Sequence, residues 1–265
     1  ELDIRTTKIT SEVSTDGKFI TTKLIDRENY VYEIKEHNSH SLLKDIRIHL
    51  YFLNQSAKNI FKRKMGIEAI NYGSVFVYKN GFRILPFGEP RDDSFGIDAR
   101  ALQGFNRYIG TRNLIGQVEI LGDNEGLRET TSRDGGLVKT KSYNQLVEYL
   151  IEGLKRLEKY VIDVTQWGVN NDDENIDLSS DKAIEGLVKL VANISDKNTI
   201  ELNYNKDIIN LLSLKEEKSA SRLVKNFKRI ATESNNPTLL KDAKRLEKTL
   251  TSALEAKKSA EKELE

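Results

Sequence analysis

Hydrophobic and polar residues alternate along the first 38 residues, in a pattern that favours β-strands. The alternating stretches are IRTTKIT, KFITTKLI and YVYEI, and all are rich in β-branched residues. Asp16-Gly17, between the first two stretches, is a typical turn pair. The pattern therefore predicts a three-stranded antiparallel segment in residues 1–38.

Strand and helix periods are mixed between residues 39 and 168. NQSAKNIFKRKMG has a helical pattern, with Gly66 placed to end it. GSVFVYKNGFRILPFG predicts two strands joined by an Asn80-Gly81 turn, and LIGQVEIL predicts another buried strand. In SLLKDIRIHLYFLN both periods are partly satisfied, since four apolar residues alternate as in a strand: Ile46, Ile48, Leu50 and Phe52.

A long amphipathic helix is predicted by SYNQLVEYLIEGLKRLEKYVIDVTQWG, which Trp167-Gly168 would close. Its helically spaced apolar residues are Leu146, Tyr149, Leu150, Leu154, Leu157, Tyr160 and Val161. The polar stretch VNNDDENIDLSS then predicts a linker.

Residues 169–265 are rich in lysine and glutamate and predict an all-helical arm. Its last segment carries a seam in alternating spacings of four and three residues: Leu239, Ala243, Leu246, Leu250, Ala253, Lys257, Ala260 and Leu264. The seam predicts the start of a coiled coil, and a solvated amphipathic helix is an open alternative.

Composition narrows the class of protein. The 265 residues, with 38% hydrophobic and 31% charged residues, can form one sizeable core and a second unit. The net charge of +1 argues against a wholly basic nucleic-acid binder. The chain contains no cysteine, which excludes disulfides and thiolate metal sites, and we expect a cytoplasmic location. No apolar run suits a membrane span or signal peptide, so no membrane partner is expected.

Most active-site motifs are missing from the chain. His37, His40 and His49 are not accompanied by metal-ligand spacing, so no metal site is predicted and exposed or core positions are expected. GDNEG at 122–126 lacks the oxygen-ligand spacing of a calcium loop and predicts a turn. No Walker A sequence or GxGxxG occurs.

Arginine is concentrated between residues 83 and 133, where seven arginines and no lysine occur: Arg83, Arg91, Arg100, Arg107, Arg112, Arg128 and Arg133. A guanidinium group suits phosphate or carboxylate and stays charged when desolvated. Two interpretations are open. The arginines form ion pairs with Asp92, Asp93, Asp98 and Asp134, or some of them, with Arg83, Arg107 and Arg112 as candidates, contact phosphate or nucleic acid.

The polar stretch RETTSRDGGLVKT, residues 128–140, directly follows the predicted strand LIGQVEIL. By itself, Ser-Arg-Asp-Gly-Gly most often forms a turn. Its position between a buried strand and the long helix makes Arg133 a candidate for contact with a ligand.

The order of these segments resembles the second, or transducer, domain of the GHKL ATPases, which include DNA gyrase B, the ninety-kilodalton heat-shock chaperone, MutL and the MORC proteins. The resemblance covers residues 39–168 through YGSVFVYKNGFRILPFGE, LIGQVEI, TTSRDGGL and YNQLVEYLIEGLKRLEKYV. It implies an α+β, ribosomal-S5-like transducer domain, with a mixed or antiparallel sheet packed on helices, between the segment 1–38 and the helical arm 169–265.

The resemblance also implies a role for the loop. A basic loop residue in the family contacts the γ-phosphate of ATP, so Arg133 would be the phosphate sensor, supported by Ser132, Asp134, Gly135 and Gly136. The Asp-x-Gly-x-Gly loop and the glycine-rich lid that hold nucleotide are missing. ATP and Mg²⁺ would therefore be bound by an N-terminal ATPase domain that precedes this chain, and the fragment alone is not expected to be active.

A longer protein also agrees with a chain that begins without methionine and stops inside a helical pattern. We expect the full protein to be a homodimer whose arm moves with nucleotide state. The alternatives are a DNA- or RNA-binding module with an arginine-rich surface and a structural coiled-coil adaptor.

Overall fold

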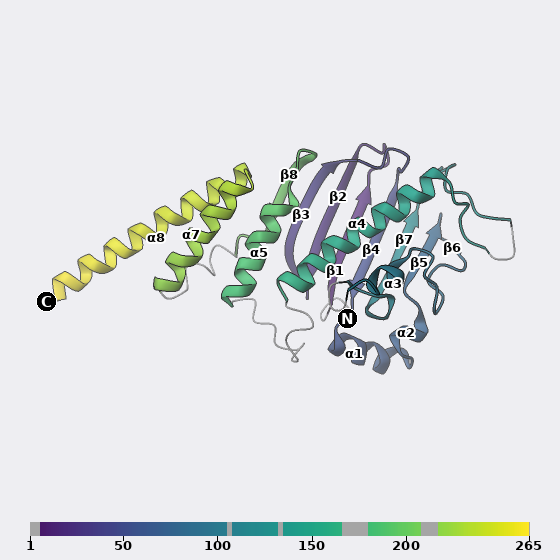
Figure 1. Cartoon of the computed structure of the whole chain (residues 1–265), viewed down its shortest axis with the longest axis horizontal. Helices are drawn as coiled ribbons and strands as arrows, with labels where there is room; N and C mark the ends of the chain where they lie inside the picture. Colours follow the sequence, from purple (N-terminus) through teal and green to yellow (C-terminus); the bar gives the residue numbers. More distant parts are fainter. Residues whose placement is uncertain (1–5, 105–107, 132–134, 166–179, 208–216, 265) are drawn as a thin grey trace.

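An eight-stranded mixed sheet forms the centre of the protein (Figure 1), with strand order β6-β5-β7-β4-β1-β2-β3-β8. The computed structural model describes residues 6–104, 108–131, 135–165, 180–207 and 217–264. The strands are β1 (Thr7–Val13), β2 (Phe19–Asp26), β3 (Asn29–His37), β4 (Ile46–Phe52), β5 (Val75–Lys79), β6 (Phe82–Ile84), β7 (Leu114–Ile120) and β8 (Thr199–Tyr204). Neighbouring strands are antiparallel except β5 and β7, which are parallel.

Helices and strands are interspersed in the described residues. They are α1 (Gln55–Met65), α2 (Ala69–Tyr72), α3 (Ile97–Ala101), the 3-10 turn η1 (Thr111–Asn113), α4 (Lys141–Asp163), α5 (Asp181–Ile194), α7 (Glu217–Glu233) and α8 (Pro237–Leu264). The predicted α+β class and a mixed sheet packed on helices are therefore confirmed.

The residues that the sequence predicts to end a helix or form a turn do so in the structure. Gly66 ends α1 in the left-handed conformation, and its N–H donates to the Lys62 carbonyl at 2.9 Å. Asn80 and Gly81 both have positive φ, 49° and 84°, and join β5 to β6. The three N-terminal strands also pair antiparallel, as the alternation predicts.

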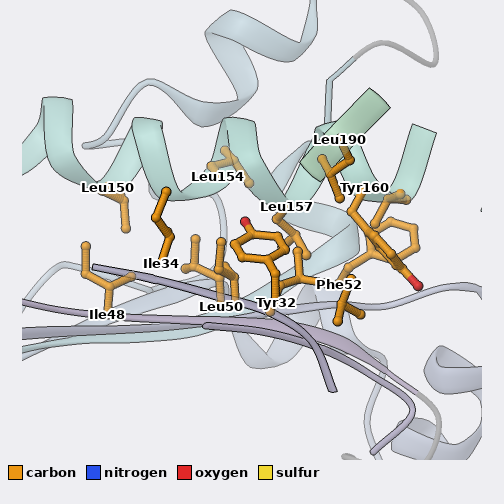
Figure 2. Close-up of a cluster of buried hydrophobic side chains, with 14 of the residues drawn as sticks. Tyr32, Ile34, Ile48, Leu50, Phe52, Leu150, Leu154, Leu157, Tyr160 and Leu190 are labelled. Carbon is orange, nitrogen blue, oxygen red and sulfur yellow. The ribbon is translucent and has the colours of Figure 1, made fainter. Parts of the chain in front are cut away.

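The apolar stripe of α4 covers one face of the sheet (Figure 2). Leu150, Leu154 and Leu157 project from the helix towards Ile34, Ile48 and Leu50 of the strands, and all of them are buried. Thr140 caps the start of α4 by accepting a hydrogen bond from the Tyr143 N–H at 3.1 Å. All seven residues predicted for this stripe belong to the core.

The prediction of an all-helical arm is wrong in one element. Strand β8 lies in residues 169–265 and pairs antiparallel with β3, at the edge of the sheet. TIELNY carries β-branched and aromatic residues but is short, and pairing with β3 is what fixes it as a strand. The expected boundary after residue 168 falls in 166–179, outside the described residues, while α5 beyond it shares one hydrophobic core with α4.

The first positions of the predicted coiled-coil seam pack against another helix of the same chain. Leu239, Ala243 and Leu246 of α8 are buried in the core that also contains Leu223 and Phe227 of α7. For residues 253–264 the structure describes the helix and not the side chains, so the later seam positions are not compared. In its first turns α8 thus forms an intramolecular pair with α7, and the coiled coil beyond them stays a prediction.

Candidate functional site

A short hairpin carries the segment that the sequence singled out. Glu129 and Leu137 form an antiparallel bridge, the Thr130 N–H donates to the Gly136 carbonyl at 2.9 Å, and the Val138 N–H donates to the Arg128 carbonyl at 2.8 Å. Ser132, Arg133 and Asp134, which connect these two sides in the sequence, are outside the described residues.

Gly135 and Gly136 anchor this hairpin to the end of β6. Both have positive φ, 65° and 89°, as their expected turn role requires. The Gly136 N–H donates to the Leu85 carbonyl, and a Cβ atom at Gly135 would lie 2.4 Å from the same oxygen. Only a residue without a side chain allows this approach, so the glycine pair fixes where the hairpin leaves the sheet.

We expect Gly135→Ala to detach the hairpin from β6. Its Cβ would collide with the Leu85 carbonyl and the residue would keep a strained φ, so the free energy of unfolding should fall by about 2 kcal/mol. Urea denaturation measures the loss, and amide exchange at Gly136 and Val138 shows whether it is local. Gly66→Ala is the control, since that positive-φ glycine has no atom within 4 Å of its Cβ position; equal losses in both variants would contradict the proposed anchor.

Exposed apolar and basic residues occur in the hairpin and in the β6 segment, together with the exposed Glu129 of the hairpin. Phe82, Leu85 and Val138 are exposed hydrophobic residues, with relative exposures of 77%, 55% and 36%. Arg128 and Lys139 are exposed on the two sides of the hairpin. We call these five residues the hairpin surface. Exposed apolar residues beside like charges are typical of a surface that another protein domain covers.

Two arginines of the arginine-rich segment are used in ion pairs. Arg83 donates to Glu89 at 2.6 Å and lies over the Phe76 ring, and Arg100 forms a two-bond pair with the buried carboxylate of Glu158. The ion-pair interpretation is therefore right for these two residues, but their partners are glutamates rather than the expected aspartates.

Two of the aspartates that were expected to pair with arginine instead accept hydrogen bonds from backbone N–H groups. Asp93 accepts hydrogen bonds from the N–H groups of Asp98 and Ala99, both at 2.9 Å. Asp98 accepts from the backbone and hydroxyl of Thr111, at 2.7 and 2.6 Å. These carboxylates hold backbone turns, as short acidic side chains commonly do. Asp134 lies outside the described residues.

The other arginine candidates are not brought to the hairpin as a group. Arg107 lies outside the described residues. Arg112 is exposed in η1, where it lines an open depression of about 560 Å³ together with Lys58 and exposed Leu102. Arg83 is tied to Glu89, so the described residues do not join Arg83 and Arg112 into one phosphate site.

Among the histidines, His40 is buried and its Nε2 lies 3.0 Å from a carboxylate oxygen of Glu152. This hydrogen bond lowers the pKa of the Glu152 carboxyl. His37 is exposed. Within the described part of the chain, no three His, Cys, Asp or Glu residues are grouped as metal ligands.

A second hollow was missed by the sequence reasoning. A pocket of about 460 Å³ lies between α4 and strands β1 to β3, and its lining includes Ser11, Thr22, Tyr149, Gly153 and Arg156. Two features could have indicated it: hydroxyl residues at strand positions that face the core, and a glycine on the apolar face of a long helix.

Helix α8 is tied to β8 and its following residues, and to the loop that precedes β8. Tyr204 of β8 and Lys206 both donate to the Asp242 carboxylate of α8. Asn236, which caps the first turn of α8, also donates to the Ser195 hydroxyl at 3.1 Å in the loop between α5 and β8. A displacement of β8 would therefore be transmitted to α8.

Searches of protein-family models, of curated proteins and of solved structures found no match to this chain. Within the described residues, no helix is sufficiently long and apolar to span a membrane.

Proposed function

We propose that this chain is the transducer part of a GHKL-type ATPase, in which Arg133 senses the γ-phosphate of a nucleotide bound by a preceding domain. The observation that supports the proposal most is the anchored hairpin. Its glycine pair anchors the hairpin to Leu85 at the end of β6, and the Arg133 segment connects the two sides of that hairpin in the sequence. A guanidinium held in place stabilises charge on phosphoryl oxygens without a cost of reorganisation.

The hairpin surface supports the same proposal. Phe82, Leu85 and Val138 offer apolar contact area, and Arg128 and Lys139 add positive charge. An ATPase domain seated there would cover the apolar residues and bring its phosphates near the hairpin. ATP and Mg²⁺ would be bound by that domain, and the ribosomal-S5-like fold and the homodimer belong to the same proposal.

A path from the hairpin to the arm exists in the fold. The sheet runs from β6 at one edge to β8 at the other, and β8 holds α8 through Tyr204 and Asp242. Since the phosphate contact disappears after hydrolysis, a change in the docking of the ATPase domain would reorient the sheet and α8 together.

The test is Arg133→Ala in the full-length protein that contains the ATPase domain. We expect ATP turnover to fall by roughly 10- to 100-fold while ATP affinity is largely kept, because the arginine acts mainly on the charge that develops during hydrolysis. Arg63→Ala is the control, since this exposed arginine lies on α1 and outside the hairpin surface. Unchanged turnover in Arg133→Ala would reject the proposal.

The same preparations distinguish the alternatives. A nucleic-acid-binding module predicts binding of DNA or RNA that weakens steeply with salt. A structural adaptor predicts dimers that form without nucleotide and no effect of Arg133→Ala. The Glu partners of Arg83 and Arg100 reduce the charge left for a phosphate backbone, and this favours the transducer.

A further inference from the structure

The pocket beneath α4 has the position and size of a small-molecule site. Its volume of about 460 Å³ lies within the range common for ligand pockets. One wall is the turn of α4 that contains Tyr149 and Gly153, and the opposite wall is the inward face of β1 to β3. Asp196 and Asn198, in the loop between α5 and β8, line its rim.

Hydroxyl groups replace apolar side chains at this level of the core. Ser11 lies between buried Ile9 and Val13 on β1, and Thr22 lies between Ile20 and Leu24 on β2. The Tyr149 hydroxyl donates to Ser11 Oγ at 2.8 Å, and Ser11 Oγ lies 2.8 Å from Thr22 Oγ1. Hydroxyl oxygens keep acceptor capacity after such bonds, so the wall of the pocket remains able to bind polar groups.

Packing in the described structure does not require a glycine at position 153. It is buried near the middle of α4, yet a Cβ atom there would meet nothing within 4 Å. Glycine destabilises a helix interior relative to alanine. By contrast, Gly186 of α5 is required by packing, since its Cβ would lie 2.4 Å from the Asp163 carbonyl. At Gly153 the missing side chain instead leaves the pocket open.

Two of the carboxylates that line the pocket have partners, and the lining also contains one further cation, Lys155, and one further carboxylate, Asp196. Arg156 pairs with Glu36 at 2.7 Å, and His40 holds Glu152 at 3.0 Å. Burial raises the pKa of the Glu36 carboxyl, against the opposing effect of Arg156, so an additional negative charge at this position is unfavourable. A ligand without net charge fits best, and it needs both donors and acceptors for the carboxylates, the guanidinium and the hydroxyls.

From these observations we propose that the pocket between α4 and β1 to β3 binds an uncharged sugar ring with adjacent hydroxyls. Ring hydroxyls donate to Glu36, to Asp196 or to the remaining acceptor sites of Ser11 and Thr22, and they accept from Asn198; all of these groups line the pocket. The ring belongs either to a free monosaccharide or to the ribose of a nucleoside. The site is independent of the Arg133 proposal, because it uses none of the residues of the hairpin.

The test is an NMR titration of the whole chain with ribose, glucose and adenosine, and with ribose 5-phosphate and adenosine monophosphate as charged counterparts. We expect at least one neutral compound to shift the amide signals of Ser11, Thr22 and Gly153 at millimolar concentration, and to bind more tightly than its phosphorylated form. Binding by adenosine but not by ribose or glucose would identify the nucleoside as the source of the ring; binding by a free sugar would identify the monosaccharide.

Variants at Gly153 separate the site from general effects on the fold. Gly153→Ala should raise the Tm of the free protein through helix propensity and weaken binding by about tenfold, since one methyl group intrudes on the ligand. Asn144→Ala, an exposed position of α4, is the control that changes propensity without changing affinity. Gly153→Leu should fill the pocket and abolish binding.

Three results would overturn the proposal. They are no shift of these amides with any neutral compound, tighter binding of the phosphorylated forms, and unchanged affinity in Gly153→Ala. The alanine variant decides the matter even if the leucine variant does not fold.

Discussion

Glu158→Ala should lower the free energy of unfolding by about 3–5 kcal/mol, because it leaves the partly buried guanidinium of Arg100 without its counter-charge. The Glu158 side chain is only 5% exposed, and its Oε1 accepts bonds from Arg100 Nη1 and from the Ile109 N–H, both at 2.8 Å. Arg100 is 16% exposed and its guanidinium carbon lies 4.4 Å from the centre of the Tyr108 ring. Loss of this one carboxylate therefore leaves the Arg100 guanidinium and the Ile109 N–H without their hydrogen-bond acceptor.

The measurement is urea denaturation of Glu158→Ala and of a control variant in the same helix. Glu148→Ala is the control, since Glu148 is exposed on the same helix and its loss should change stability by no more than about 0.5 kcal/mol. Amide exchange should show that the early loss of protection is concentrated in α3 and η1, which Glu158 links to α4. A cost below about 1 kcal/mol for Glu158→Ala would mean that the pair adds little.

A double variant separates the charge from the space that it fills. Arg100→Met with Glu158→Leu removes both charges and keeps apolar volume, and it should recover most of the stability lost in Glu158→Ala. If the double variant recovers none of the stability lost in Glu158→Ala, the hydrogen bond to Ile109, which both variants lack, and not the unpaired charge of Arg100, accounts for the loss.

Glu158 also shows why part of this structure could not be predicted from the sequence. It follows Leu157 in an amphipathic helix, where a glutamate usually faces water. Its partner Arg100 is 58 residues away, in a segment without periodicity. Local patterns identified the strands, the Asn80-Gly81 turn and the stripe of α4, because each of these depends on neighbours in the chain. The ion-pair partners depend on how α3 packs on α4, which no local pattern contains.

The same distinction applies to β8 and to the candidate site. TIELNY becomes a strand through pairing with β3, more than 160 residues earlier in the chain. The glycine pair at 135 and 136 predicted a special backbone conformation, and both residues have positive φ. What the sequence could not provide is their contact with Leu85, since only the folded sheet brings β6 to the hairpin.

Gly73→Ala should lower the free energy of unfolding by about 4 kcal/mol, through a collision that neither backbone can avoid. A Cβ atom at Gly73 would lie 1.9 Å from the Gly88 carbonyl oxygen, and the φ of +117° is unfavourable for alanine. Residue 88 belongs to the segment after β6 in which Phe87 packs on Phe95 and Tyr143. A shift of this segment would also move Leu85, the anchor of the Arg133 hairpin, so Gly136 should lose exchange protection together with Gly88.

Gly81→Ala is the matched control: its φ of +84° is also positive, but nothing lies within 4 Å of its Cβ position, so only the backbone cost of about 1–2 kcal/mol remains. Equal losses in the two variants would show that strain in φ alone, and not the crossing of residues 73 and 88, determines the effect.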